Sequence, residues 1–204
     1  MAKPNYCLEL QLHTQGFSHV AGIDEAGRGP LAGPVAVAAV ILDPQNIPDG
    51  LDDSKRLPAQ ARARLYDAIL AQALAVGLAF EPPDVIDRVN IRAATLLAMQ
   101  RACASLSLVP DFALIDGRDV PTGLPCPARA LTGGDGISAA IAAASIIAKV
   151  SRDRLMLRLH AHIPGYGFQS HMGYGTKAHL EAIALHGASP FHRLSFAPLR
   201  RAKT

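Results

Sequence analysis

The chain has no tryptophan, 5% aromatic residues and only three cysteines among its 204 residues. So few aromatic side chains exclude an extensive stacking platform for bases. The cysteines, Cys7, Cys103 and Cys126, lie far apart, which excludes a disulfide framework and the ligand spacing of a zinc site. We therefore expect a fold held by its core, in a reducing cytoplasm.

Long apolar runs are also missing. The most apolar stretches, 35–42 and 137–148, are shorter than the roughly 20 residues that a membrane-crossing helix needs. The chain begins Met-Ala-Lys-Pro-Asn and lacks an apolar signal core, so we expect no membrane association. A net charge of +3 is only mildly basic and does not identify a partner by itself.

What is present is a chain that is 50% hydrophobic, enough for one sizeable core. Apolar runs predict strands at 20–24, 35–42, 76–80, 112–115 and 128–131. Helical patterns fall at 58–73, 90–106, 137–162 and 176–186. Two consecutive strands, followed by strands that alternate with helices, indicate an α/β fold with a mixed sheet. We expect a core of residues 1–164 and a small helical C-terminal region of residues 165–204.

Two adjacent acids, Asp24 and Glu25, end an apolar run and precede a glycine-rich turn around Arg28. Carboxylates beside a core are costly unless water, hydrogen bonds or a cation compensates them. Glycines let backbone amides approach a ligand, and an arginine fork suits phosphate. The turn therefore indicates a metal-and-phosphate site, with a charged hairpin turn as the alternative. A dinucleotide fingerprint is excluded because its third glycine is Ala32 here.

Two further acids repeat this arrangement. Asp116 ends the run 111–115, and carboxyl ends of strands are where α/β sheets place their sites. Asp135 lies in a glycine turn, where the simpler interpretation is a helix N-cap. Four such carboxylates suit a hard divalent cation. Since neighbouring strand residues point to opposite faces, we expect Glu25 to be leaving the strand if it shares a metal region with Asp24.

Basic residues gather in two places, and the alternatives are phosphate binding and a solvated face. The first group lies on one predicted helix: Lys149, Arg152, Arg154 and Arg158. The second lies near the C-terminus: Arg193, Arg200, Arg201 and Lys203. Binding through phosphates would be sensitive to salt. Lys149 can equally pair with Asp153 one helical turn later.

The chain resembles the bacterial ribonuclease HII family, of the RNase H-like superfamily. The likeness runs from about Val20 to Arg201 and rests on eight blocks in family order. These are 21–31, 53–55, 90–91, 114–117, 134–135, 143–153, 173–174 and 192–196. It implies an RNase H-like core with a mixed five-stranded sheet flanked by helices.

The resemblance also implies an activity. It is that of an endonuclease that hydrolyses the RNA strand of RNA–DNA hybrids and cuts 5′ of single ribonucleotides embedded in duplex DNA. Two-metal hydrolysis with Mn²⁺ or Mg²⁺ would leave 3′-OH and 5′-phosphate ends. The partners would be hybrids and ribonucleotide-containing DNA duplexes, and the protein would act as a cytoplasmic monomer.

Family roles carry over to individual positions. Four acids match the catalytic positions, the first three as principal metal ligands: Asp24, Glu25, Asp116 and Asp135. The loop that recognises the ribose 2′-hydroxyl matches Gly27, Arg28 and Gly29. Ser54 and Lys55 match positions associated with phosphate contacts. Tyr174 matches the tyrosine that packs on the nucleotide following the ribonucleotide.

One position departs from the family pattern. Met172 stands where the family usually has lysine, which removes one exposed charge beside Tyr174, worth about 1 kcal/mol or less. Two other classes stay open: a metal-dependent nuclease or strand-transfer enzyme that acts on all-DNA duplex, and a hybrid-binding module without catalysis.

Overall fold

The computed structural model describes residues 3–200 and contains a five-stranded sheet in the order β3-β2-β1-β4-β5. Its strands are β1 (Val20–Ala26), β2 (Val35–Ile41), β3 (Ala75–Glu81), β4 (Phe112–Asp116) and β5 (Ala128–Leu131). β1, β2 and β3 pair antiparallel, whereas β4 runs parallel to both β1 and β5. The predicted mixed α/β sheet is confirmed.

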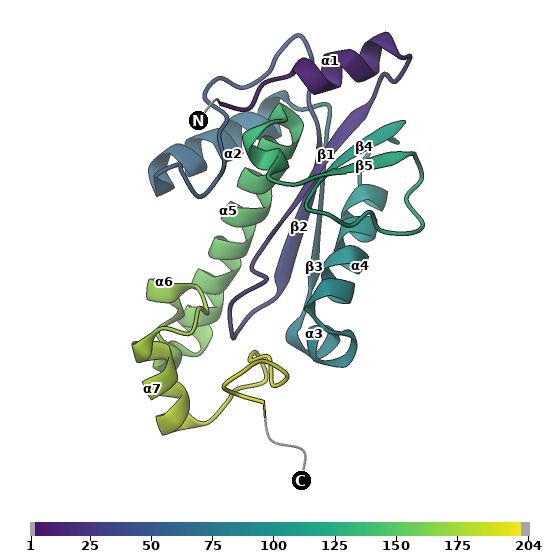
Figure 1. The fold of residues 1–204 in the computed structure, drawn as a ribbon. Coiled ribbons are helices and arrows are strands. Elements are labelled where there is room, and N and C mark those ends of the chain that lie inside the picture. The colour runs from purple at the N-terminus through teal and green to yellow at the C-terminus, as the bar shows by residue number, and fades with distance from the viewer. Residues whose placement is uncertain (1–2, 201–204) are drawn as a thin grey trace.

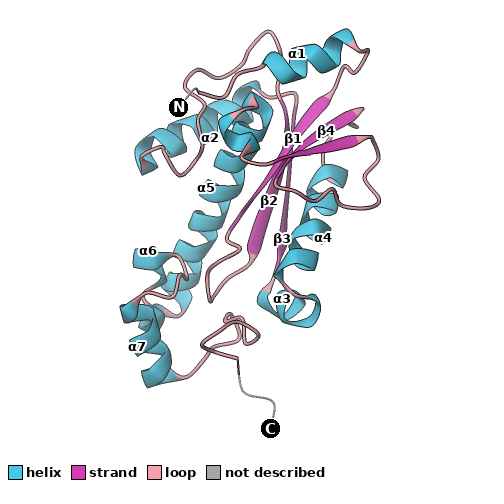
Figure 2. Cartoon of the chain, in the orientation of Figure 1, coloured by secondary structure: helices cyan, strands magenta, loops and turns pink. Residues whose placement is uncertain are grey.

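Helices cover both faces of this sheet (Figure 1). On one side lie α5 (Ala139–His162) and α2 (Ala59–Gln72), and on the other α4 (Ile91–Ala104) and α3 (Pro83–Val89). Short elements complete the fold: α1 (Cys7–Thr14), η1 (Gly134–Gly136), η2 (Pro164–Tyr166), α6 (Phe168–His171) and α7 (Lys177–His186). Figure 2 shows long loops between them at both ends of the sheet. Within residues 3–200, no helix combines the length and apolarity needed to cross a membrane.

Small side chains set the close packing of α5 on the sheet. The first ten residues of α5 are buried, and most of them are alanine. Gly22 of β1 lies directly beneath this helix, because a Cβ added there would be 2.1 Å from the carbonyl carbon of Ala140. The helix axis can therefore approach the strand more closely than larger residues would allow.

The sheet register creates an opening beside the acids. The pairing of β1 with β4 ends at Ile23, opposite Ile115, whereas its pairing with β2 continues to Ala26. The expectation that Glu25 leaves the strand is wrong, since Glu25 pairs with Val37. The pairing of β1 with β4 ends before these acids instead. Asp24 and Glu25 therefore have no backbone partner on the β4 side of β1.

The C-terminal segment attaches to the glycine-rich loop between β1 and β2. The backbone of Leu31 accepts from Arg193 N at 2.8 Å and donates to Gly173 O at 2.8 Å, and Ala32 forms a β-bridge with His192. Two residues of the predicted basic group, Arg201 and Lys203, lie outside the described residues.

Candidate metal centre and substrate cleft

Three carboxylates converge where β1, β4 and η1 meet. Asp24, Asp116 and Asp135 each offer an oxygen atom, and these atoms lie within 4.8 Å of one another. Asp24 is only 3% exposed. Asp135 is not the N-cap of α5, because Ser138 occupies that position and accepts a hydrogen bond from Ile141 N at 3.2 Å. The structure thus joins three acids that are far apart in sequence.

Glu25 lies beside this group rather than in it. As the residue next to Asp24 on a strand, it faces the other side of the sheet. Its carboxylate lies 3.4 Å from Arg28 Nη1 and lines a small cleft together with Asp116 and Arg118. Burial raises the pKa of Glu25, while Arg28 opposes the shift. Asp116 is therefore flanked by Asp24 on one side and Glu25 on the other.

The electrostatics of the acids favour a cation. Burial raises the pKa of Asp24 well above its usual value, and the charges of Glu25 and Asp116 raise it further. Burial also raises the pKa of Asp135, against the effect of Lys55. A bound cation would remove both the repulsion and the cost of desolvation.

The donor set fits a hard divalent ion. Asp24 Oδ1 accepts from Glu25 N and Asp116 Oδ1 from Gly134 N, each at 2.7 Å. The Oδ2 atom of each has no hydrogen-bond donor within residues 3–200. Free carboxylate oxygens in a buried cluster are the ligands that Mg²⁺ and Mn²⁺ prefer.

A cleft of about 240 Å³ opens beside these acids. All the residues predicted to bind substrate line it: Gly27, Arg28, Gly29, Ser54, Lys55 and Tyr174. The rest of the lining consists of Asp24, Glu25, Ala26, Lys149 and Arg152. Segments from the first third and the last third of the chain therefore share one site.

Two lysines supply positive charge to the cleft. Lys55 is exposed and Lys149 is half-buried. Lys55 Nζ lies 3.3 Å from Asp135 Oδ2, and the Lys55 side chain is 75% exposed. Partial burial lowers the pKa of Lys55, but Asp135 and Asp53 outweigh this and raise it. Lys149 pairs with Asp153 at 2.8 Å, one of the two alternatives expected from the sequence.

Comparison with known proteins identifies the family. The family model described as Ribonuclease HII matches residues 21–199. The chain belongs to the ribonuclease HII family. Its ribonuclease HII relatives include those of Brucella canis (54% identical, covering 97% of this chain and 90% of the relative) and Agrobacterium fabrum (54%, 97% and 91%).

Solved structures of ribonucleases H share the fold of this family member. The ribonuclease H2 of Pyrococcus horikoshii gives a TM-score of 0.77 at 26% identity, over 90% of this chain and 96% of that one. The structure of the PCNA:RNase HII complex from Archaeoglobus fulgidus gives a TM-score of 0.73 at 29% identity. The match covers 92% of this chain and 98% of that one. A Bst-RNase HIII complex with Mn²⁺ matches in fold alone, at 20% identity over 89% and 68%, with a TM-score of 0.70.

Membership of the ribonuclease HII family establishes the general activity. The protein is a ribonuclease H, an endonuclease that acts on RNA–DNA hybrids and depends on a divalent metal.

Two residues of the predicted basic groups of this ribonuclease HII family member are buried, one from each group. Arg152, expected on a basic helix face, is 1% exposed, and its guanidinium contacts the glycine-rich loop from below. Arg193 is equally buried beneath the same loop. Helical spacing gave no signal for this, because a buried arginine and a solvated one fit the same pattern.

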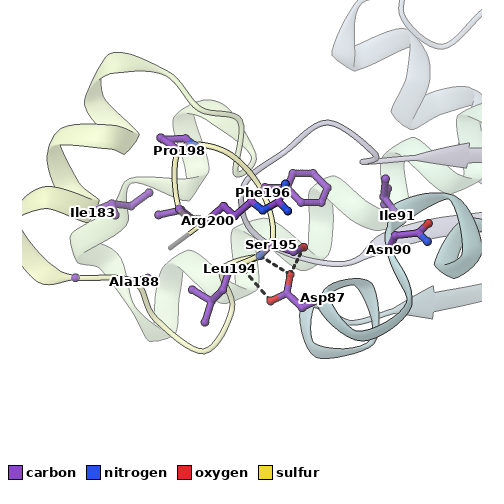
Figure 3. A pocket seen from close by; sticks show the side chains of 12 residues that line it. Asp87, Asn90, Ile91, Ile183, Ala188, Leu194, Ser195, Phe196, Pro198 and Arg200 are labelled. Atoms are coloured by element: carbon purple, nitrogen blue, oxygen red, sulfur yellow. Dashed lines mark hydrogen bonds between the residues drawn. The ribbon is translucent and has the colours of Figure 1, made fainter. Parts of the chain in front are cut away.

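A larger cleft of about 1180 Å³ lies elsewhere (Figure 3). It separates the C-terminal segment from α3 and the start of α4, and none of the predicted site residues lines it. The carboxylate of Asp87 at its rim accepts hydrogen bonds from Leu194 N at 2.8 Å and from Ser195 N and Oγ at 3.0 and 2.6 Å. This acid fastens the C-terminal segment to α3.

Proposed function

We propose that this ribonuclease H hydrolyses the phosphodiester bond on the 5′ side of a ribonucleotide, both in hybrids and at single ribonucleotides embedded in duplex DNA. One observation carries the proposal: Asp24, which clusters with Asp116 and Asp135, lines the same cleft as the whole predicted substrate-binding set. The family membership supports it, since the resemblance implies this specificity.

The acids would hold Mg²⁺ or Mn²⁺, with Asp24, Glu25 and Asp116 as principal ligands and Asp135 beside them. Two such ions, when bound, would supply an activated water and stabilise the charge that develops on the phosphate. Asp24, Asp116 and Asp135 form one cluster, and Glu25 lines a small cleft with Asp116 beside it. Lys55 offsets the charge of Asp135 and faces the path of the phosphate backbone.

Selection of a ribonucleotide would rest on the loop 27–29 and on Tyr174. Telling RNA from DNA needs a donor or acceptor aimed at the 2′-hydroxyl, and backbone groups can reach it where side chains would collide. Gly29 leaves this space open, since a Cβ added there would lie 3.7 Å from Tyr174 Cε1. The ring of Tyr174 is half exposed and can pack on the nucleotide that follows.

We further propose that residues 165–204 act as a substrate-binding region on a core of residues 1–164. Tyr174 belongs to this region, and the backbone bonds of Leu31 join it to the loop of the core. A monomer is the proposed acting form, because one chain by itself brings acids and the whole predicted substrate-binding set to a single cleft.

The test is cleavage of a labelled DNA duplex that holds one ribonucleotide, with Mg²⁺, Mn²⁺ or chelator, beside an all-DNA duplex of the same sequence. We expect metal-dependent cutting 5′ of the ribonucleotide and an intact control. Cutting of both duplexes would instead indicate a general nuclease. Binding without cutting in any metal would indicate a recognition module.

A further inference from the structure

Two arginines are the largest fully buried side chains of the described chain, and both lie under the substrate loop. Arg152 is 1% exposed and Arg193 is 0% exposed. Each guanidinium donates three hydrogen bonds, all to main-chain carbonyl oxygens. Among residues 3–200, neither has a carboxylate within 4.0 Å. The family roles carried over from sequence assign neither residue.

Arg193 fixes the orientation of two peptide groups in the loop. Its Nη2 donates to Gly27 O at 2.6 Å, its Nη1 to Arg28 O at 2.9 Å and its Nε to Gly33 O at 2.9 Å. In a planar trans peptide the N–H points opposite to the carbonyl. The carbonyls of Gly27 and Arg28 face the guanidinium, so the amides of Arg28 and Gly29 are turned away from it.

These two amides are free donors beside the cleft. Within residues 3–200, neither the N–H of Arg28 nor that of Gly29 has a protein acceptor. Both residues line the cleft, next to Tyr174. A hydroxyl or a phosphate oxygen bound there would satisfy donors that the protein leaves unpaired.

Arg152 ties the rest of the loop to the segment that carries Tyr174. Its guanidinium donates to Ala32 O at 3.0 Å, Pro34 O at 2.9 Å and Met172 O at 2.9 Å. Met172 lies two residues before Tyr174, so one side chain sets the spacing between the loop and that ring. Gly27 has φ +90° and lies against Arg152, because an added Cβ would be 1.9 Å from its Nε.

The positive charge of the pair is compensated only in part, by the more distant carboxylates of Asp153 and Asp87. Burial lowers the pKa of Arg152, and burial together with the charge of Arg152 lowers the pKa of Arg193 to about 9. Buried cations without a carboxylate partner are costly, and carbonyl dipoles compensate them only in part. Arg152 lines the cleft, so a phosphate bound there would supply the missing negative charge.

We propose that Arg152 and Arg193 are positioning residues that preset the loop for a ribonucleotide, holding its two free amides toward the 2′-hydroxyl and its flanking phosphate. This inference rests on the proposed function, because it assumes that the loop recognises the ribose. It adds that the recognition depends on two buried guanidinium groups that hold the loop through its backbone carbonyl oxygens.

The test uses Arg193→Lys and Arg152→Lys, since lysine keeps the charge but cannot donate to three carbonyls in a fork. Single-turnover cleavage of the one-ribonucleotide duplex gives its half-saturating enzyme concentration. The all-DNA duplex, added as competitor, gives an inhibition constant. The selectivity ratio is the inhibition constant divided by the half-saturating enzyme concentration. We expect this ratio to fall at least tenfold in each variant. Affinity for all-DNA duplex, measured by fluorescence anisotropy in chelator, should stay within threefold.

Phe168→Leu is the matched control for a merely structural role. Phe168 packs under the same region, near Ala32 and Met156, but donates nothing to the loop. This variant should lose thermal stability and keep the ratio within twofold. Should Arg193→Lys fail to fold, Arg152→Lys carries the test alone.

Two results would overturn the inference. One is an equal loss of affinity for both duplexes in the lysine variants. The other is the same fall of the ratio in Phe168→Leu. Wild-type protein with no preference for the ribonucleotide would refute the proposed function itself, and this inference with it.

Discussion

Lys55 and Asp135 form an ion pair in which Nζ lies 3.3 Å from Oδ2. The pair joins the most exposed cation of the cleft to the buried acids that it faces. Because the ammonium is exposed, the pair itself contributes little stability. The same ammonium is available to a phosphate, so in the proposed function it would lie between the acids and the nucleic-acid backbone.

Lys55→Ala should weaken duplex binding at low salt and reduce its salt dependence. Loss of one phosphate contact lowers the slope of log affinity against log salt concentration by about 1. Affinity measured across a salt series checks this. Arg154→Ala is the control, since that guanidinium contacts Asp67 and the Tyr66 ring. An unchanged slope in Lys55→Ala would show that Lys55 makes no phosphate contact.

Asp24→Asn should abolish metal-dependent cleavage and stabilise the metal-free protein. The variant removes a buried charge that burial, Glu25 and Asp116 all disfavour, as the raised pKa of Asp24 shows. We expect a gain of about 1–3 kcal/mol in the free energy of unfolding. Urea unfolding in chelator measures it, with the exposed Asp49→Asn as control.

The same pair of proteins tests the ligand assignment without activity. Added Mn²⁺ or Mg²⁺ should raise the melting temperature of the wild type, because an ion that binds only the folded state stabilises it. The rise should be smaller in Asp24→Asn. An equal rise, or near-normal turnover of this variant or of Asp116→Asn, would contradict the assignment.

Arg28→Ala should lower activity on a single embedded ribonucleotide by about tenfold, the effect of one charge-assisted hydrogen bond. The Arg28 carbonyl is held by Arg193, so truncating the exposed side chain should leave the loop backbone in place. Kinetics on that substrate check this, with Arg28→Lys retaining charge but not the fork. Unchanged kinetics in Arg28→Ala would exclude the side chain from the site.

Stability should fall as the solution is acidified below about pH 6.5. His179 and His192 are buried with their Nε2 atoms 3.1 Å apart. Burial lowers the pKa of His179, and burial with the charge of His179 lowers the pKa of His192 from 6.5 to about 4. Between these values the unfolded chain binds more protons than the folded one, so the stability present above pH 6.5 is lost toward pH 4.

Urea unfolding at pH 7.5, 5.5 and 4.5 measures this effect, which should be on the order of 2 kcal/mol. His192→Asn removes the titrating ring while keeping a polar group near Ser189. The free energy of unfolding of this variant should therefore fall less over the same pH range. Identical pH profiles in the two proteins would show that the histidine pair does not govern acid stability.

Glu9→Ala should destabilise the fold by about 1–3 kcal/mol, because it leaves buried donors unsatisfied. The fully buried Glu9 Oε1 accepts from Ser138 Oγ at 2.5 Å and from Ala140 N at 2.9 Å, at the N-terminus of α5. A carboxylate is favoured there by the helix dipole. Chemical unfolding compares this variant with Glu9→Gln, which keeps an acceptor and should lose less. Equal stability of Glu9→Ala and wild type would refute the role.

The main elements of the fold were predictable because their signals are local. Apolar runs marked all five strands, and the predicted helices at 58–73, 90–106, 137–162 and 176–186 agree with α2, α4, α5 and α7 to within two residues at each end. Helix α1 was not predicted. It has no side-chain cap, and Glu9 and Leu12 hold it through contacts with distant residues.

The sequence by itself determined which chemistry the chain can carry: acids at strand ends beside glycines, one arginine in a glycine-rich turn and the blocks of the ribonuclease HII family. Only the tertiary structure decided how they combine. It grouped Asp135 with Asp24 and Asp116, because β1–β4 pairing stops one residue before Asp24. It also buried Arg152 and Arg193 under the loop, where six backbone carbonyls accept their hydrogen bonds. Carbonyl groups are the same in every residue, so no pattern of side chains could show which of them would converge on an arginine.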